Sequence, residues 1–229
     1  MELGLGPGLN LFFGDNAQGK TNLLEAVALL ASLRSFRGVK GSAAVAWGEK
    51  ECIIKGETEA LREGGSVRTR RMQLSIEKGG RRVTLDGKKP ESPAEYLLTL
   101  RVSSFSPEDL FLVREYPASR RRFLDRSIFY LQPGYLDIAR NCGNAIKQLS
   151  SSLKAGDRKV AESWEEVLAP LAAEVCWRRR RKVDELGPLA AAMFNEIFGV
   201  GGLGFSYKTQ AKGDSVGELT ESFRSLFEK

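Results

Sequence analysis

The sequence contains no histidine. Histidine is the commonest general base and transition-metal ligand in proteins, and it is the usual partner of a nucleophilic serine or cysteine. Its absence excludes those catalytic pairs and every histidine-based metal centre. Any chemistry that this chain supports has to come from carboxylates, cations, hydroxyls and backbone groups.

Cysteines and long apolar runs are also scarce. The three cysteines, Cys52, Cys142 and Cys176, lie far apart and form no C-x-x-C pair, so the sequence indicates neither a disulfide framework nor a zinc site. No apolar stretch approaches the roughly 20 residues of a membrane-spanning helix, and the first residues lack the pattern of a signal peptide. We therefore expect a cytoplasmic protein with no membrane association.

The overall charge is moderately basic. The chain has 229 residues, with 35 Lys and Arg against 29 Asp and Glu, which gives a net charge of +6. The length fits one large domain or two lobes, and the composition is ordinary for a soluble globular protein. A positive balance is compatible with a polyanionic partner, but it does not identify one.

A glycine-rich motif carries the clearest chemistry. The segment Gly14-Asp15-Asn16-Ala17-Gln18-Gly19-Lys20-Thr21 matches the phosphate-binding pattern G-x-x-x-x-G-K-[ST]. The apolar run from Leu9 to Phe13 predicts a buried strand before it, and the Leu- and Ala-rich segment from Thr21 to about Leu33 predicts a helix after it. Strand, loop and helix in this order predict a nucleoside triphosphate site, with ATP as the expected nucleotide.

Each position of the motif has a physical task. Gly14 and Gly19 allow backbone turns that side chains would block, so that N–H groups of the loop can point at the phosphates. Lys20 adds a positive charge, the Thr21 hydroxyl is placed to bind Mg²⁺, and the start of the helix adds its positive end. The expected nucleotide-binding residues are Gly14, Asp15, Asn16, Ala17, Gln18, Gly19, Lys20, Thr21 and Asn22.

The pattern of polar and apolar residues changes twice after this motif. From about Val39 to Val102, short alternating segments separated by Gly64-Gly65, Gly79-Gly80 and Asp86-Gly87 predict a meander of antiparallel strands. At Ser106-Pro107-Glu108-Asp109, a capping serine followed by proline and acids predicts the start of a helical lobe. We expect an ATP-binding lobe over 1–104, a helical lobe over 105–200, and the start of a return to the first lobe over 201–229.

Within the second lobe the pattern predicts several helices. One starts at Pro117, one follows Pro133-Gly134, and a long one runs from about Lys159 to Phe198. Proline and glycine inside the long pattern, at Pro170 and at Gly187-Pro188, predict a kink or break. After it, Leu203, Phe205 and Tyr207 alternate like a returning strand, and the segment from Glu218 to Lys229 predicts an amphipathic helix.

The motif with its flanks, LNLFFGDNAQGKTNLLEAV, resembles the RecF family of bacterial recombinational repair proteins. The ATPase head of that family belongs with the SMC and Rad50 heads in the ABC superfamily. Two further blocks match in the same order, Arg34-Ser35-Phe36-Arg37 and FSPEDLFLVREYPASRRRFLD from Phe105 to Asp125. The resemblance implies an α/β P-loop NTPase head of the ABC/SMC type, with an antiparallel β subdomain and a helical second lobe.

The resemblance also implies a biological role. Such a protein acts in DNA replication and recombinational repair, where it supports recombinase loading at single-strand gaps and the SOS response. It binds ATP and Mg²⁺, forms an ATP-dependent homodimer and has weak ATPase activity stimulated by DNA. Its partners are single-stranded and gapped double-stranded DNA, RecO and RecR.

The sequence departs from the family pattern at both ends. The family normally has about one more strand before the position of Met1 and, downstream, an L-S-x-G-Q signature and an apolar run closed by paired acids. Neither downstream feature is found here, because Val83-Thr84-Leu85-Asp86 is followed by Gly87 and better predicts a hairpin turn. We therefore expect a fragment truncated at both ends, with no catalytic residue of its own, that binds ATP weakly and barely hydrolyses it.

Arginine clusters are the candidate DNA contacts. They are Arg68, Arg70, Arg71, Arg120, Arg121 and Arg122. A solvated strand or helix face explains each cluster equally well, and the second cluster could instead anchor the helical lobe. The run from Arg178 to Lys182 cannot all meet one duplex, because consecutive helical residues point in steps of about 100°. Its neighbours Glu174, Asp184 and Glu185 can pair with it.

Two other kinds of protein share the phosphate-binding motif. A small-molecule kinase requires alternating strands and helices after the first helix, whereas the pattern here predicts an antiparallel meander. An SMC- or Rad50-type head carries long heptad coiled-coil arms, and the helical pattern from Lys159 to Phe198 lacks sustained heptads. Both remain alternatives at the level of the sequence.

Overall fold

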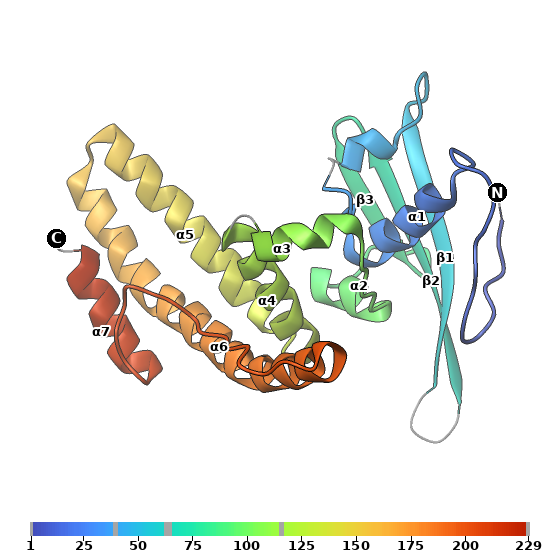
Figure 1. Ribbon diagram of the computed structural model, residues 1–229. Coiled ribbons are helices and arrows are strands. Elements are labelled where there is room, and N and C mark those ends of the chain that lie inside the picture. Colours follow the sequence, from blue (N-terminus) through green and yellow to red (C-terminus); the bar gives the residue numbers. More distant parts are fainter. Residues whose placement is uncertain (1, 39–40, 62–65, 115–116, 228–229) are drawn as a thin grey trace. The chain divides into compact units, whose positions relative to one another are not determined.

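A computed structural model describes residues 2–38, 41–61, 66–114 and 117–227 (Figure 1). The chain divides into two compact units, residues 1–111 and 112–229. The turn expected at Gly64-Gly65 lies outside the described residues. In chain order the elements are α1 (Lys20–Ser32), η1 (Gly41–Ala44), β1 (Glu51–Leu61), β2 (Val67–Glu77), β3 (Gly80–Leu85), α2 (Pro93–Thr99), η2 (Pro107–Asp109), α3 (Leu110–Arg114), α4 (Pro117–Leu131), α5 (Tyr135–Ala155), α6 (Arg158–Phe198) and α7 (Val216–Phe227).

The first unit contains the predicted antiparallel meander, with the strand order β1-β2-β3. Alternation along β2 buries Met72, Leu74 and Ile76 on one face, as the pattern predicts. After β3, Asp86 and Gly87 have φ values of 53° and 78°, the backbone of a type I′ hairpin turn. The predicted hairpin turn at Asp86-Gly87 is confirmed.

Helices α1 and α2 pack on the buried face of this sheet (Figure 1). Leu29 and Leu30 of α1 and Tyr96 of α2 share one core with the buried side chains of β2 and β3. Burial of each such leucine stabilises the unit by about 1.5–3 kcal/mol. The packing holds α1 on the sheet and thereby fixes the position of the loop that precedes it.

Helix α2 interrupts the segment that the pattern predicts to be entirely strands, so that prediction is corrected here. The Ser92 hydroxyl accepts a hydrogen bond from the Glu95 N–H at 3.1 Å, and the Glu95 carboxylate accepts one from the Glu91 N–H at 2.8 Å. This reciprocal pattern is close to a capping box. The segment Ser92-Pro93-Ala94-Glu95 therefore carries a local helix-start signal that the strand prediction ignores.

Gly56 of β1 lies against Leu30 of α1. A Cβ atom at this position would lie 2.7 Å from Cδ2 of Leu30. We expect Gly56→Ala to displace the buried Leu30 side chain and to lower the free energy of unfolding by about 1–3 kcal/mol. Urea denaturation followed by circular dichroism measures this. Gly79→Ala is the control, because a Cβ there meets nothing within 4 Å, and equal effects of the two changes would contradict the packing argument.

The strand predicted from Leu9 to Phe13 does not form. This segment is irregular chain, and Leu9, Leu11 and Phe13 are exposed. A strand needs a neighbour to bind its N–H and C=O groups. Among the described residues the sheet consists of β1, β2 and β3, none of which pairs with this segment. The prediction of a buried strand here is wrong because it rests on apolar character alone.

The second unit is built on the antiparallel pair α5 and α6, against which α4 and α7 pack (Figure 1). Gly156, with φ of 73°, ends α5, and the Asp157 carboxylate accepts a hydrogen bond from the Val160 N–H at 3.1 Å to start α6. Glycine at a helix end and aspartate at a helix start are the usual caps. No helix among the described residues is long and apolar enough to cross a bilayer.

Helix α6 runs without a break through Pro170 and Gly187-Pro188, so of the predicted kink or break the break is wrong, and the kink stays a prediction. A proline removes one helical hydrogen bond, but the packing of α5 and α7 along α6 holds the helix together. Gly187 is buried, and Phe205 lies against it, 3.4 Å from where a Cβ would be. The segment around Phe205 follows α6 as irregular chain, so the predicted returning strand over Leu203 to Tyr207 is also wrong.

Candidate nucleotide-binding site

The loop of the phosphate-binding motif immediately precedes α1. Three of its residues have positive φ: Gly14 at 146°, Ala17 at 65° and Gly19 at 89°. Gly19 is the residue before the first helical position and contributes no side-chain cap. Positive φ values in such a loop turn successive N–H groups toward a common side, which forms an anion-binding concavity.

The Lys20 ammonium group ties this loop to itself. It donates hydrogen bonds to the carbonyl oxygens of Gly14 at 2.7 Å and Asp15 at 2.6 Å. An ammonium group has three donors, so two hold its position and one remains for a ligand. The contacts fix a positive charge beside the backbone groups that the motif assigns to phosphate binding.

The start of α1 offers further donors. The Leu23 N–H donates to the Gly19 carbonyl at 3.0 Å, so the N–H groups of Lys20, Thr21 and Asn22 precede the first helical hydrogen bond. The first turn contains no acidic residue, and no side chain caps this end. Because the helix dipole is positive here, the site fits a ligand with several anionic oxygens, and the exposed Thr21 hydroxyl is available to a cation bound to them.

Glu25 connects α1 to the segment that follows it. Its carboxylate accepts a hydrogen bond from the Ser35 hydroxyl and lies 3.4 Å from Nη1 of Arg37. Glu25 follows Thr21 by four residues, so both lie on one face of α1, one turn apart. The block Arg34 to Arg37, which has no predicted role, is thus tied back to the helix that carries the motif. In the sequence, this contact is indicated only by Glu25 itself, an acid within the mostly apolar segment Leu23 to Ala31.

The arginines near the start of β2, Arg68, Arg70 and Arg71, do not form one cluster. Arg68 and Arg70 share the face of Met72, whereas Arg71 points to the opposite face. Arg70 is only 15% exposed and contacts Asp86 at 2.7 Å and Glu95 at 3.0 Å, whereas Arg71 is 77% exposed and pairs with Glu57.

These contacts change the chemistry of Glu95. Hydrogen bonds from the Glu91 N–H and from Arg70 hold the pKa of the Glu95 carboxyl below its usual range. The positive charge of Arg70 is therefore neutralised by carboxylates within the first unit.

The candidate arginines of α4 also diverge. Arg120 donates to the Leu112 carbonyl at 3.3 Å, and Arg122 donates to the Ser119 hydroxyl at 3.0 Å. Arg120, Arg121 and Arg122 are all exposed, and they point in successive steps of about 100° around the helix. The assignment of these six arginines to DNA stays a prediction.

The basic run from Arg178 to Lys182 is explained largely by contacts within the second unit. Four of its members bind different groups: Arg178 the carboxylate of Glu174 (2.6 Å), Arg179 both oxygens of Asp125 (2.7 and 2.8 Å), Arg180 the carbonyl of Gly213 (2.6 Å) and Lys182 the carboxylate of Glu185. The predicted pairing with Glu174 and Glu185 is confirmed. Asp184 forms no ion pair among the described residues.

Arg179, Asp125 and Tyr135 form a partly buried network that the sequence pattern does not predict. The Tyr135 hydroxyl donates to Asp125 at 2.6 Å, and its side chain is buried. Burial and the neighbouring carboxylate raise the pKa of Tyr135 above its ordinary value. Burial alone would lower the pKa of Arg179, but its hydrogen bonds and charge contact with Asp125 outweigh burial and raise it. Asp125 and Arg179 are 54 residues apart in the sequence, so no local pattern predicts their contact.

No protein-family model matches the chain. By sequence the chain is similar to the DNA replication and repair protein RecF of Geotalea uraniireducens, with 36% identity over 190 residues that cover 83% of this chain and 51% of that protein. It is 39% identical to the RecF of Anaeromyxobacter dehalogenans over 202 residues, covering 87% of this chain and 53% of that protein. The chain thus spans about half the length of the curated relatives it matches.

By fold the chain is similar to solved structures of the recombination mediator protein RecF. With RecF-ATP in the RecFOR pathway the TM-score is 0.87 at 26% identity, over 99% of this chain and 62% of that chain. With RecF-ATPrS the TM-score is 0.79 at 26% identity, over 98% of this chain and 62% of that chain. The predicted α/β P-loop NTPase fold is confirmed.

Proposed function

The chain belongs to the RecF family over the part that it spans, and we propose that its first unit binds ATP with Mg²⁺ at the loop from Gly14 to Asn22. The observation that carries this proposal is the Lys20 ammonium group, held by two loop carbonyls at the uncapped start of α1. The two similar solved structures are of RecF-ATP and RecF-ATPrS, which supports the choice of ATP.

Each part of the site has a role in binding. The backbone N–H groups of the loop and of the first turn of α1 donate to phosphate oxygens, and Lys20 neutralises part of their charge. The Thr21 hydroxyl would hold Mg²⁺, which, when bound, neutralises the phosphates and orients them. The residues from Gly14 to Asn22 include no general base in this scheme, so the loop binds and positions the nucleotide.

We also propose the wider role of the complete protein. The relatives are named DNA replication and repair proteins, and the RecF of the first similar structure acts in the RecFOR pathway. On this basis the proposed partners are single-stranded and gapped DNA, RecO and RecR. The proposed assembly is an ATP-dependent homodimer with weak DNA-stimulated ATPase activity, and the proposed location is the cytoplasm. The exposed Arg68, Arg71 and Arg121 are better DNA candidates than Arg70, whose charge two carboxylates already neutralise.

The order of the elements argues against a small-molecule kinase. Such kinases place alternating parallel strands and helices after the first helix. Here α1 is followed by three antiparallel strands, β1, β2 and β3. The arrangement supports an ABC/SMC-type head instead.

The role of Thr21 is tested by the Mg²⁺ dependence of nucleotide binding. We expect the wild-type chain to bind a fluorescent ATP analogue about tenfold more weakly after Mg²⁺ is removed with EDTA, because the phosphate charge is then less neutralised. Thr21→Val keeps the branched shape and loses the hydroxyl, so it is expected to bind with the same weak affinity under both conditions. Thr69→Val, on an exposed position of β2, is the control. Full Mg²⁺ dependence in Thr21→Val would rule out this role.

A further inference from the structure

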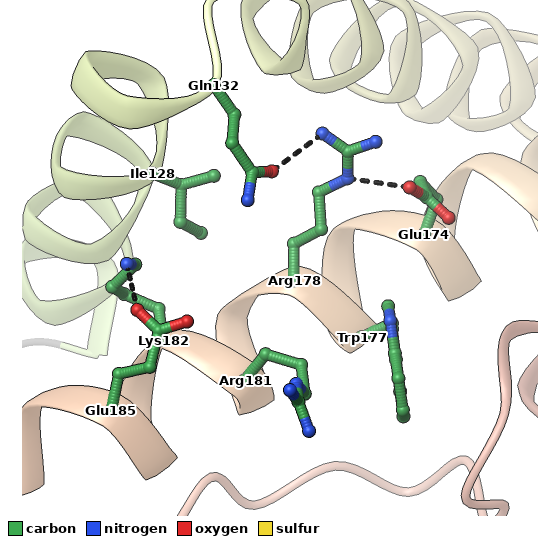
Figure 2. A pocket seen from close by; sticks show the side chains of 8 residues that line it. All are labelled: Ile128, Gln132, Glu174, Trp177, Arg178, Arg181, Lys182 and Glu185. Atoms are coloured by element: carbon green, nitrogen blue, oxygen red, sulfur yellow. Dashed lines mark hydrogen bonds and ion pairs between the residues drawn. The ribbon is translucent and has the colours of Figure 1, made fainter.

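A polar pocket in the second unit has no part in the proposed function. It has a volume of about 320 Å³ and is lined by Ile128 of α4, by Gln132 directly after α4, and by six residues of α6 between Glu174 and Glu185 (Figure 2). The α6 residues follow one another in steps of three and one, which places them on one face of that helix. The pocket therefore has one mixed wall and one strongly charged wall.

The ion pair between Lys182 and Glu185 in this pocket is asymmetric. The Lys182 side chain is 6% exposed, whereas the Glu185 side chain is 56% exposed. A buried ammonium group needs an anion beside it, but an exposed carboxylate that leaves regains its contacts with water. Among the described residues Lys182 forms no other ion pair. Glu185 is therefore the member of the pair that another carboxylate can replace.

The two arginines of the pocket, Arg178 and Arg181, differ in whether a carboxylate pairs with them. Arg178 is held by Glu174 at 2.6 Å and by the Gln132 side-chain oxygen at 3.0 Å, and Figure 2 shows its guanidinium turned toward both. Arg181 forms no ion pair among the described residues, and its guanidinium carbon lies 5.8 Å from the centre of the Trp177 ring. Arg181 thus adds a positive charge next to an indole, and no carboxylate of the described residues pairs with it.

We propose that this pocket binds an acidic side chain of a protein partner, whose carboxylate replaces Glu185 at Lys182 and whose apolar neighbour packs against Trp177. Tryptophan and arginine are the residue types that contribute most to protein interfaces. Because only the carboxylate of Glu185 is replaced, the pocket takes one carboxylate from the partner. Arg181 supplies long-range attraction for the same charge.

The order of charges along α6 favours a single carboxylate over a nucleic acid. Glu174 lies one turn before Arg178, and Glu185 lies one turn after Arg181, so carboxylates flank the cations at both ends. A nucleic acid strand carries a phosphate on every nucleotide. Phosphates on either side of a bound one would approach Glu174 and Glu185 and be repelled. A peptide with one acidic residue avoids this repulsion.

The test uses Trp177 as the reporter. In the full chain carrying Trp47→Phe and Trp164→Phe it is the remaining tryptophan. The probe is the peptide acetyl-Gly-Leu-Asp-Leu-Gly-amide, compared with the same peptide carrying asparagine. We expect a saturable change in Trp177 fluorescence, with the asparagine peptide at least about tenfold weaker because it lacks the charge. Circular dichroism checks that each variant is folded.

Variants at the ion pair separate exchange from simple attraction. Glu185→Gln removes the competing carboxylate and is expected to tighten binding of the aspartate peptide by about three- to tenfold, and Lys182→Met to abolish it. Glu196→Gln, an exposed acid elsewhere on α6, controls for net charge and should change nothing.

Three outcomes would overturn the proposal: equal binding of the two peptides, no gain in Glu185→Gln, or a Lys182-dependent response to oligo-dT in place of the peptide. If Lys182→Met fails to fold, the peptide pair and Glu185→Gln still decide.

Discussion

Lys20→Ala is expected to abolish measurable ATP binding and to leave the fold unchanged. The lysine contributes the side-chain cation of the proposed site, and its ammonium group is already positioned by the carbonyls of Gly14 and Asp15. A fixed charge that binds phosphate oxygens is stronger than a neutral hydrogen bond. We expect affinity to fall by at least about 100-fold, which corresponds to about 2.7 kcal/mol. Isothermal titration calorimetry with ATP and Mg²⁺ measures the change.

The thermal midpoint of unfolding distinguishes a binding role from a structural one. Lys20 precedes the core residues of α1, which begin at Ala28, so its removal should shift the midpoint by no more than about 2 °C. Lys78→Ala, at the exposed turn between β2 and β3, removes the same charge and should leave ATP affinity unchanged. ATP binding of wild-type strength in Lys20→Ala would show that the loop is not the nucleotide site.

The features predicted correctly from the sequence are those that short segments determine by themselves. The loop from Gly14 to Lys20 and its following helix, the strands of the meander, and the turn at Asp86-Gly87 all depend on local rules. Asp86 and Gly87 adopt positive φ because the two-residue turn requires it, and the Asp-Gly pair is a strong local signal for that turn.

The features predicted wrongly depend on distant neighbours. Whether the apolar run from Leu9 to Phe13 forms a strand depends on a pairing partner, which the run itself does not specify. Whether Pro170 and Pro188 break α6 depends on the helices packed along it. Gly187 has the local character of a helix breaker, yet it lies within α6 with Phe205 packed against it. In each case a tertiary contact outweighs a local preference.

The contacts of the basic run of α6, Arg178 to Lys182, are predicted only in part from the sequence. The spacing of Glu174 and Arg178 predicts an ion pair within the helix, and the structure contains it. The spacing cannot reveal that Arg179 reaches Asp125 of α4, because that contact depends on how two helices pack. A cluster that resembles a nucleic-acid surface in the sequence is largely occupied by internal contacts, so charge content alone is a poor guide to this site.

Asp125→Ala is expected to cause a large loss of stability in the second unit. The Asp125 carboxylate accepts both hydrogen bonds of the Arg179 guanidinium, at 2.7 and 2.8 Å, and one from the buried Tyr135 hydroxyl at 2.6 Å. Its removal leaves a largely buried cation without a counter-charge, which costs about 3–5 kcal/mol. Urea denaturation of the chain measures the loss. Asp137→Ala breaks an exposed pair with Arg140 and should cost less than about 1 kcal/mol.

A double variant identifies the source of that loss. If the cost of Asp125→Ala comes from the unpaired charge of Arg179, then adding Arg179→Met should restore at least half of the lost stability, because methionine fills similar space without needing a counter-charge. If the double variant is as unstable as the single one, the cost comes instead from the Tyr135 hydroxyl or from lost packing. Asp125 closes the third block that resembles the RecF family, so recovery would identify pairing with Arg179 as the structural role of this residue within that block.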